Sequence, residues 1–416
     1  MMLLLSHSRV ASLSLRASPT FVFCVYLLLL GNVRAAEWSL KGNVNQSIGY
    51  DDNVEMLPTN LQGSFKYMIV PVLTFAHKTD YSEVSANAIY GTQVYTEIPE
   101  LNQDIQNYSL SGVYKTKMID WGLSSSYSIT PTRNTAVQSS GVFNNNSSSN
   151  TWTISPSMSY KIDLVNSLIL TPSYSETTFT DSGQAVNSDS IGFVDNTTFN
   201  VNLGWQRIWS ERYVSTVSWF YFNYEPQQKT NNSSSDQPQD SQFDSVGMNF
   251  SNDYKWSENW KLEGTVGFRH TESSFNGGNN SSLGFLTNVG VSYTDEKFSS
   301  GIYFNRSLIP SNQGQLQELS SVHLNMGYKI LEQLSASFSA GYQDSTLIDS
   351  ISPSSRANFV LEPSLNWQMS QDWTLSASYR YRSQEGDLQS NDFNNGTAVS
   401  NLFQISINYN WQGLKN

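Results

Sequence analysis

The chain has 416 residues and a formal net charge of −12, with charged side chains at only 14 % of positions and aromatic ones at 13 %. Because no basic stretch could neutralise phosphates, this composition excludes nucleic acid as a partner. With one cysteine in the chain, neither a disulfide framework nor a cysteine-ligated metal site is expected.

Residues 1–35 are predicted to be a signal peptide. Arg9 and Arg16 precede the apolar run Phe21–Leu30, and small residues follow it. About ten apolar residues are too few for a membrane helix, whereas this basic, apolar, small order is typical of an export leader. Its removal would take away three arginines and the cysteine, bring the formal charge to −15, and leave 36–416 as a single exported domain.

The remaining chain alternates apolar and polar side chains. In 151–163 the even positions hold residues such as Trp152 and Met158, while the odd positions hold Thr, Ser and Lys. The segments 334–343 and 373–382 repeat the pattern. A period of two places successive side chains on opposite faces of a β-strand.

About eighteen such segments are present, most of them ten to fourteen residues long, enough to cross a bilayer as tilted strands. The segment from Arg212 is the least regular, because Phe220 and Phe222 share a face with hydroxyl side chains. The predicted strands begin near Trp38, Ser64, Tyr81, Ile105, Trp121, Thr151, Ser167, Thr197, Arg212, Phe243, Asn259, Leu283, Phe298, Gln317, Gln333, Ala357, Trp373 and Asn401.

The connections alternate in length. Turns of three or four residues, such as 77–80 and 163–166, alternate with long polar loops. The predicted long loops include 133–150, 181–196, 226–241, 271–282 and 384–400, and the Asn- and Ser-rich runs 144–150 and 231–236 could fold inward as a constriction. Short periplasmic turns and long extracellular loops are typical of bacterial outer-membrane barrels.

Tryptophans gather beside the short turns. They are Trp38, Trp121, Trp209, Trp256, Trp260, Trp373 and Trp411. Amphipathic rings at one depth form an interfacial girdle in a membrane barrel. The alternative is a soluble β-sandwich with core tryptophans, but a chain of this length would need two or more such domains, and no linker divides it.

The fold predicted is therefore an all-β, transmembrane, antiparallel up-and-down barrel of about 18 strands in the bacterial outer membrane. Its expected partners are outer-membrane lipid and lipopolysaccharide. The last strand ends on Trp411, an aromatic near the terminus of the kind that the barrel-assembly machinery recognises. The oligomeric state is left open.

The sequence predicts no enzyme. His77, His270 and His323 remain after the leader, and no Gly-x-Ser-x-Gly or His-Glu-x-x-His pattern occurs. No catalytic residue and no cofactor are assigned. A hydrolase at the rim would require a His, a Ser and an acid to converge in space.

The run Tyr50, Asp51, Asp52 and Asn53 ends the first strand. Two carboxylates and an amide could hold a hard cation such as Ca²⁺. The same residue types form turns through hydrogen bonds from side chain to backbone. We favour the turn and assign no metal site.

The polar face of the strands is predicted to line the lumen. It is mainly Ser, Thr, Asn, Gln and Gly, which suits water, ions and neutral or weakly charged sugars, although these residues are also ordinary polar strand fillers. The charged residues predicted to line the pore are scattered and partly balanced: Lys41, Lys115, Lys161, Lys261, Glu263, Arg269, Glu362, Arg380 and Arg382.

Three features resemble the β-barrel porin 2 group of outer-membrane proteins: the start 47–54 with its turn Tyr50–Asn53, the Pro-Ser strand motifs at 155–157, 171–173 and 363–364, and the hairpin 367–382. The resemblance spans most of the exported chain. It implies a link to exopolysaccharide or exosortase loci, hence to polysaccharide export or attachment, and offers no catalytic motif.

The leading hypothesis is a passive channel for polysaccharide or other polar solutes. A structural or adhesive barrel that contacts surface polysaccharide is the second. A densely packed, inward-folded loop would favour the second hypothesis, and an open polar pore would favour the first.

Overall fold

Eighteen strands make up nearly all of the molecule. The computed structural model describes residues 37–139, 147–180, 193–227, 242–275, 278–348, 355–386 and 396–415; the predicted leader lies outside these ranges. The strands are β1 (Glu37–Asp51), β2 (Ser64–Lys78), β3 (Ser82–Tyr95), β4 (Gln103–Lys115), β5 (Ile119–Pro131), β6 (Ser148–Lys161), β7 (Asn166–Phe179), β8 (Asp195–Ser210), β9 (Tyr213–Gln227), β10 (Gln242–Lys255), β11 (Trp260–Phe275), β12 (Gly278–Thr294), β13 (Phe298–Pro310), β14 (Leu316–Leu331), β15 (Leu334–Leu347), β16 (Ser355–Gln368), β17 (Trp373–Gly386) and β18 (Gly396–Lys415).

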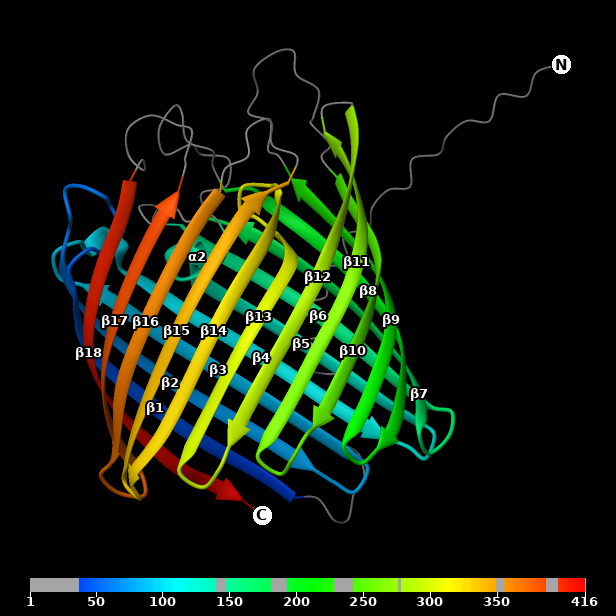
Figure 1. Ribbon diagram of the computed structural model, residues 1–416. Coiled ribbons are helices and arrows are strands. Elements are labelled where there is room, and N and C mark those ends of the chain that lie inside the picture. The colour runs from blue at the N-terminus through cyan, green and yellow to red at the C-terminus, as the bar shows by residue number, and fades with distance from the viewer. Residues whose placement is uncertain are drawn as a thin grey trace.

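The sheet closes on itself. Each strand pairs antiparallel with its neighbours in sequence, and β1 pairs with both β2 and β18 (Figure 1). The β1–β18 register runs from Ser39 opposite Lys415 to Asp51 opposite Leu402. Closure removes the free edges that an open sheet would leave. The predicted all-β, up-and-down, antiparallel barrel is confirmed, and the predicted number of about eighteen strands agrees with the eighteen observed.

The two rims differ. At the turn end, where β1 starts and β18 finishes, connections have two to four residues (Figure 1). At the opposite loop end lie the short 3₁₀ helix η1 (Pro99–Leu101) and the helix α2 (Thr132–Ser139). No helix in the described ranges is both long and apolar enough to cross a membrane.

Two predicted strand starts were wrong by five residues. β12 begins at Gly278 and β18 at Gly396, so the predicted loop 271–282 is largely the continued hairpin of β11 and β12. Its residues are polar on both faces, which hides the alternation, but the backbone pairing with β10 continues to Ser274.

Most of the loop at 133–150 is α2 and the start of β6, while 144–146 and 231–236 lie outside the described residues.

One face of the sheet is apolar and exposed. Side chains such as Phe268, Phe285 and Trp219 are 58 %, 71 % and 51 % exposed. Most of the tryptophans predicted to form a girdle do project from the barrel beside the turn end; they are Trp121, Trp209, Trp256, Trp260, Trp373 and Trp411. Apolar area of this extent is normally removed from water by lipid or by a partner.

The turn between β6 and β7 provides a pH-dependent test. Asp163 accepts hydrogen bonds from the backbone of Val165 (2.8 Å) and Asn166 (2.7 Å) and from the Asn166 amide (2.8 Å). The Asn166 side chain and these backbone donors lower the carboxyl pKa below its ordinary 3.8. The ionised form therefore stabilises the folded state above the ordinary pKa, and this contribution is lost as the pH falls through the lowered pKa.

We expect Asp163→Asn to reduce the thermal unfolding temperature slightly at pH 7, with the difference from wild type narrowing below about pH 4. Thermal melts across that range would check it. Asp80→Asn, in the turn before β3, is the matched control. A difference that stays constant with pH would contradict the role of the Asp163 charge.

Candidate functional site

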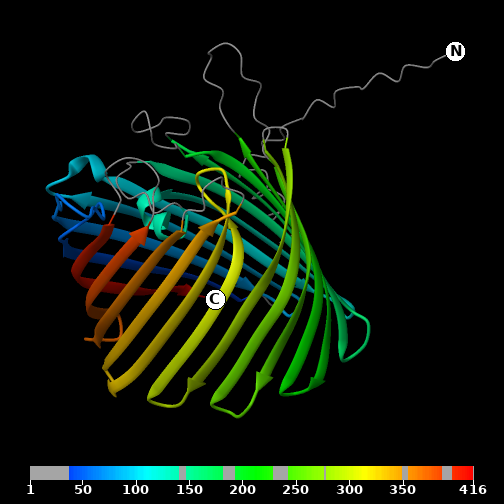
Figure 2. The same ribbon diagram turned by 45° about the horizontal axis from the view of Figure 1, so that its top comes forward.

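A contact across the barrel identifies its inner face. The Tyr224 hydroxyl on β9 donates a hydrogen bond of 3.1 Å to the Ser311 carbonyl, in the connection between β13 and β14. β10, β11 and β12 separate these strands in the sheet, which curves around its interior between them (Figure 2), so the contact lies on the inner side. Tyr224 alternates with Trp219 and Tyr221, which are 51 % and 38 % exposed and therefore project outward. Strand alternation and register then assign the inner face around the barrel.

Hydroxyl and amide side chains cover much of this inner face. Between β6 and β7, Thr153 and Ser175 lie 3.0 Å apart and Ser155 donates to Ser173 at 2.8 Å. Elsewhere the Ser85–Ser111 pair, at 2.7 Å, remains exposed to solvent. Polar groups at such positions are accessible to water within the lumen.

Seven of the nine residues predicted to line the pore make ion pairs. Lys161 pairs with Asp120 (2.8 Å), and Lys261 with Glu263 (2.7 Å). Near the loop end, the pairs are Arg380 with Glu362 (2.7 Å), Arg382 with Asp51 (2.8 Å), and Arg269 with Glu318 (3.1 Å). Lys41 and Lys115 are exposed and form no ion pair with a described residue.

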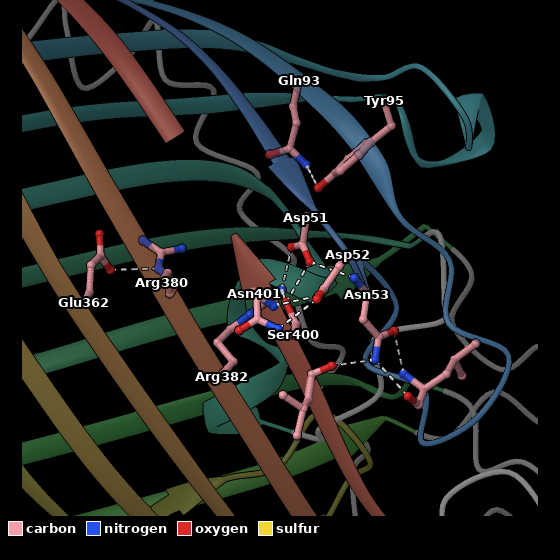
Figure 3. Close-up of polar contacts among 12 residues, drawn as sticks. Asp51, Asp52, Asn53, Gln93, Tyr95, Glu362, Arg380, Arg382, Ser400 and Asn401 are labelled. Atoms are coloured by element: carbon pink, nitrogen blue, oxygen red, sulfur yellow. Dashed lines mark hydrogen bonds and ion pairs between the residues drawn. The ribbon is translucent and has the colours of Figure 1, made fainter. Parts of the chain in front are cut away.

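The predicted turn at Tyr50–Asn53 joins the first strand to the last (Figure 3). Asp51 accepts from Arg382 (2.8 Å) and from the Ser400 hydroxyl (2.7 Å), and it is 7 % exposed. Asp52 accepts from the backbone and side-chain amides of Asn401, both at 2.7 Å. These donors engage both carboxylates, so the run acts as a structural clasp across the β1–β18 seam.

Asn53 completes the clasp. Its amide donates to the carbonyls of Leu57 and Val399, each at 2.8 Å, and its oxygen accepts from the Leu57 backbone at 3.0 Å. Fully buried, Asn53 thus holds both the loop after β1 and the β18 backbone. Among the described residues no group of three His, Cys, Asp or Glu side chains is placed to hold a metal.

Two further packing sites did not follow from the sequence. In the first, Val54, Tyr95, Ile98 and Leu101 form a buried cluster at the loop end. The Arg133 guanidinium of α2 lies 5.7 Å from the centre of the Tyr95 ring and is 5 % exposed. Burial lowers the Arg133 pKa and raises that of nearby Glu55.

The second site is the tip of the β13–β14 hairpin, which is folded into the lumen. Leu316 and Tyr224, both at 0 % exposure, pack with Phe243, against which Phe222 and Leu308 also lie. These contacts fix the tip to the inner wall at β9 and β10.

A second contact reaches β8. The Asn312 carbonyl accepts from the Val194 backbone at 2.9 Å. Gly314 has a φ of +80°, and a Cβ there would come within 3.3 Å of Pro226 and Val194. A residue with a side chain is therefore disfavoured at the tip.

The hairpin leaves a break in the barrel wall. β12 and β13 pair only from Thr287 opposite Arg306 to Thr294 opposite Ser299. Beyond Arg306 the chain turns inward, so Leu308 packs against the lumen cluster instead of continuing the outward alternation of Ile302 and Phe304. In the described chain, the upper part of β12 is paired on its β11 side alone.

Three charges bridge this break, and we call them the charge staple. Glu318 of β14 pairs with Arg269 of β11 at 3.1 Å and with Arg306 of β13. Arg269 crosses β12 at Gly284, where any Cβ would lie 2.6 Å from the guanidinium. With its side chain 2 % exposed, Arg269 also donates to Thr271 at 2.8 Å.

One sequence signal pointed to this site. The irregular alternation of β9 arises because Phe220 and Phe222 face inward, and Phe222 packs beneath the hairpin tip. The tip itself carries Leu308, Ile309 and Leu316, in contrast to the polar loops elsewhere at this rim. An apolar connection opposite an aromatic inner face is the pattern that reveals an inward fold.

No protein-family model and no curated protein matches the chain. Among solved structures, it is similar to the FrpB iron transporter from Neisseria meningitidis, with 9 % identity, a TM-score of 0.50, and coverage of 92 % of this chain and 82 % of that one. The likeness shows the barrel fold alone. The chain also resembles a BenF-like porin from Pseudomonas fluorescens, with 9 % identity, a TM-score of 0.48, and coverage of 90 % and 98 %.

Proposed function

We propose that the protein is a passive channel of the bacterial outer membrane for polar solutes. The observation that carries this proposal is the pairing of a closed barrel with an exposed apolar outer face and an inner face of hydroxyls, amides and paired charges. The apolar outer face suits contact with lipid, and the polar inner face suits contact with water. A closed barrel also leaves no unpaired strand edge along most of the wall, as hydrocarbon requires.

The proposed cargo is polysaccharide or another polar solute, and the link to polysaccharide rests on the resemblance to the β-barrel porin 2 group. Neutral hydroxyl and amide groups, as in the Thr153–Ser175 pair, exchange hydrogen bonds with sugars without selecting by charge. Lipopolysaccharide, lipid and the barrel-assembly machinery are the proposed partners, and no catalytic step is proposed.

Single-channel current through the purified barrel in a planar bilayer tests the channel. We expect steady ohmic conductance that neutral oligosaccharides reduce in a concentration-dependent manner. Heat-denatured protein is the control. If protein shown to be folded gives no conductance, the channel proposal fails.

A structural barrel is the second candidate, and the inward-packed hairpin tip favours it, since Leu316 packs densely with Tyr224 on the inner wall. Its interaction with surface polysaccharide would then involve the loop end without conduction. The bilayer measurement separates the two candidates. A hydrolase is not favoured, because the His270 ring lies 3.4 Å from the Glu272 carboxylate and forms no hydrogen bond with a serine among the described residues.

A further inference from the structure

Four cations from three elements gather on one side of the lumen near the loop end. We call them the cation cluster: Lys66 of β2, Arg133 of α2, and Arg380 and Arg382 of β17. The seam between β18 and β1 brings them together, because β17 is separated from β2 only by these two strands. The sequence predicted only Arg380 and Arg382 here, as members of a scattered set.

The register brings Lys66 and Arg380 to positions on either side of β1 that are two residues apart. Lys66 lies opposite Gly49 on one side and Tyr95 on the other. Arg380 lies opposite Leu402, which in turn lies opposite Asp51. Lys66 accordingly experiences the charges of Arg380, Arg382 and Arg133 as well as that of Asp51.

The local carboxylates compensate only part of this charge. Glu362 pairs with Arg380 and Asp51 with Arg382 (Figure 3). Lys66 makes no ion pair with a described residue, and the three guanidinium nitrogens of Arg133 make no regular hydrogen bond within the described chain. These two cations therefore lack a carboxylate within ion-pairing distance, although the charge of Glu55 acts on Arg133 and that of Asp51 acts on Lys66.

Lys66 and Arg133 instead share one aromatic ring. The Lys66 ammonium lies 5.9 Å from the centre of the Tyr95 ring, and the Arg133 guanidinium lies 5.7 Å from it. The negative face of a ring attracts a cation but leaves its hydrogen-bond donors unused. Gln93 meanwhile donates to the Tyr95 hydroxyl at 2.7 Å, which fixes the ring (Figure 3).

We propose that the cation cluster is a binding site for the oxyanion group, carboxylate or phosphate, of an acidic solute in the lumen. A guanidinium and an ammonium with free donors match oxyanion geometry and form charge-assisted hydrogen bonds. Arg380, whose side chain is 41 % exposed, and Glu362 border the site on the side of the water-filled lumen. The neutral hydroxyl and amide lining does not distinguish solutes by charge, whereas this site would favour anionic ones. It is a local positive site in a chain whose overall charge is negative.

This inference deepens the proposed channel function, and its test separates the two. The full barrel is titrated with galacturonate, glucose 6-phosphate and glucose by calorimetry, and the same solutes are added during bilayer recording. We expect at least one acidic sugar to bind and to reduce the current at lower concentration than glucose. Which of the acids binds identifies carboxylate or phosphate as the group recognised.

The variant Lys66→Gln with Arg133→Gln should weaken binding of the acidic sugar by about tenfold or more, on the scale of a lost charge-assisted hydrogen bond, and leave the glucose response unchanged. Lys297→Gln, exposed in a turn-end connection, is the matched control and should bind as wild type. Lys66→Arg should restore part of the affinity.

Equal binding of glucose and both acids, or undiminished acid binding by the double variant, would overturn the site. If the folded barrel does not conduct but binds an acidic sugar through Lys66 and Arg133, the channel fails and the site stands. If the barrel conducts but shows no preference for the acidic sugars, the site fails and the channel stands.

Discussion

Replacing Glu318 with glutamine is expected to release the β13–β14 hairpin from the lumen wall. Glu318 is the shared acid of the charge staple, and the Arg269 side chain is only 2 % exposed. Removing one partner of a buried ion pair costs about 3–5 kcal/mol, because the other charge remains desolvated. The tip would then be attached by the apolar contacts of Leu316 and Leu308 and by the hydrogen bonds to the carbonyls of Ser311 and Asn312.

Thiol labelling would detect the release. The only cysteine, Cys24, lies in the predicted leader, so Leu316→Cys introduces a unique probe at a position that is 0 % exposed. We expect slow reaction with a water-soluble maleimide when Glu318 is intact and much faster reaction when Glu318→Gln is added. If the protein conducts, its single-channel current should become larger and noisier.

The matched control is Glu272→Gln on β11, whose side chain is 72 % exposed and forms its ion pair, within the described residues, with His270. It removes the same charge from the same rim without touching the staple, and labelling should stay slow. Fast labelling of Leu316→Cys before Glu318 is altered would show that the tip is not held against the wall. Unchanged labelling in Glu318→Gln would show that the apolar cluster suffices.

Replacing Asp51 with asparagine is expected to weaken closure of the barrel. Asp51 is 7 % exposed and joins β1 to Arg382 and Ser400 across the seam. The change removes the carboxylate charge that faces Arg382, which is 18 % exposed, and the expected cost is again about 3–5 kcal/mol. The temperature at which folded protein converts to the unfolded form on a gel should fall clearly below that of wild type.

Glu362→Gln is the matched comparison. Its ion pair with Arg380 is of similar length, 2.7 Å against 2.8 Å, but joins strands next to each other in sequence, and the side chains are 28 % and 41 % exposed. An exposed pair contributes about 0–1 kcal/mol, so the loss should be small. Equal losses in the two variants would contradict a special role for the seam.

Strands β9 and β13 show the limit of strand periodicity as a predictor of side-chain surroundings. In β9 the broken alternation at Phe220 and Phe222 was visible in the sequence, but its cause was not, since the packing partner Leu316 is about ninety residues away. In β13, Leu308 follows the alternation of Ile302 and Phe304, so the pattern predicts an outward side chain. In the structure Leu308 instead packs against the cluster in the lumen. The direction of Leu308 depends on whether β13 stays paired with β12, which local pattern does not specify.

The charged residues show the same limit. The alternation assigned Arg269, Arg380 and Arg382 to the polar face of their strands, because a period of two assigns faces without knowledge of partners. Their partners Glu318 and Asp51 were not predicted, since each lies on a strand that is distant in sequence. Lys66 was missed altogether because it interrupts a mostly apolar strand.

The sequence by itself determined the strand period, the number of strands, the alternation of short and long connections, and the tryptophans beside the turn end. These follow from side-chain direction in extended backbone and from turn chemistry, which are local. The tertiary structure alone decided the clasp at Asp51, the inward fold of the β13–β14 hairpin, the charge staple and the cation cluster. The clasp and the cation cluster depend on closure of the sheet, which brings β17 and β18 beside β1 and β2, whereas the inward hairpin and the charge staple depend on its curvature, which lets β14 contact β9 and β11.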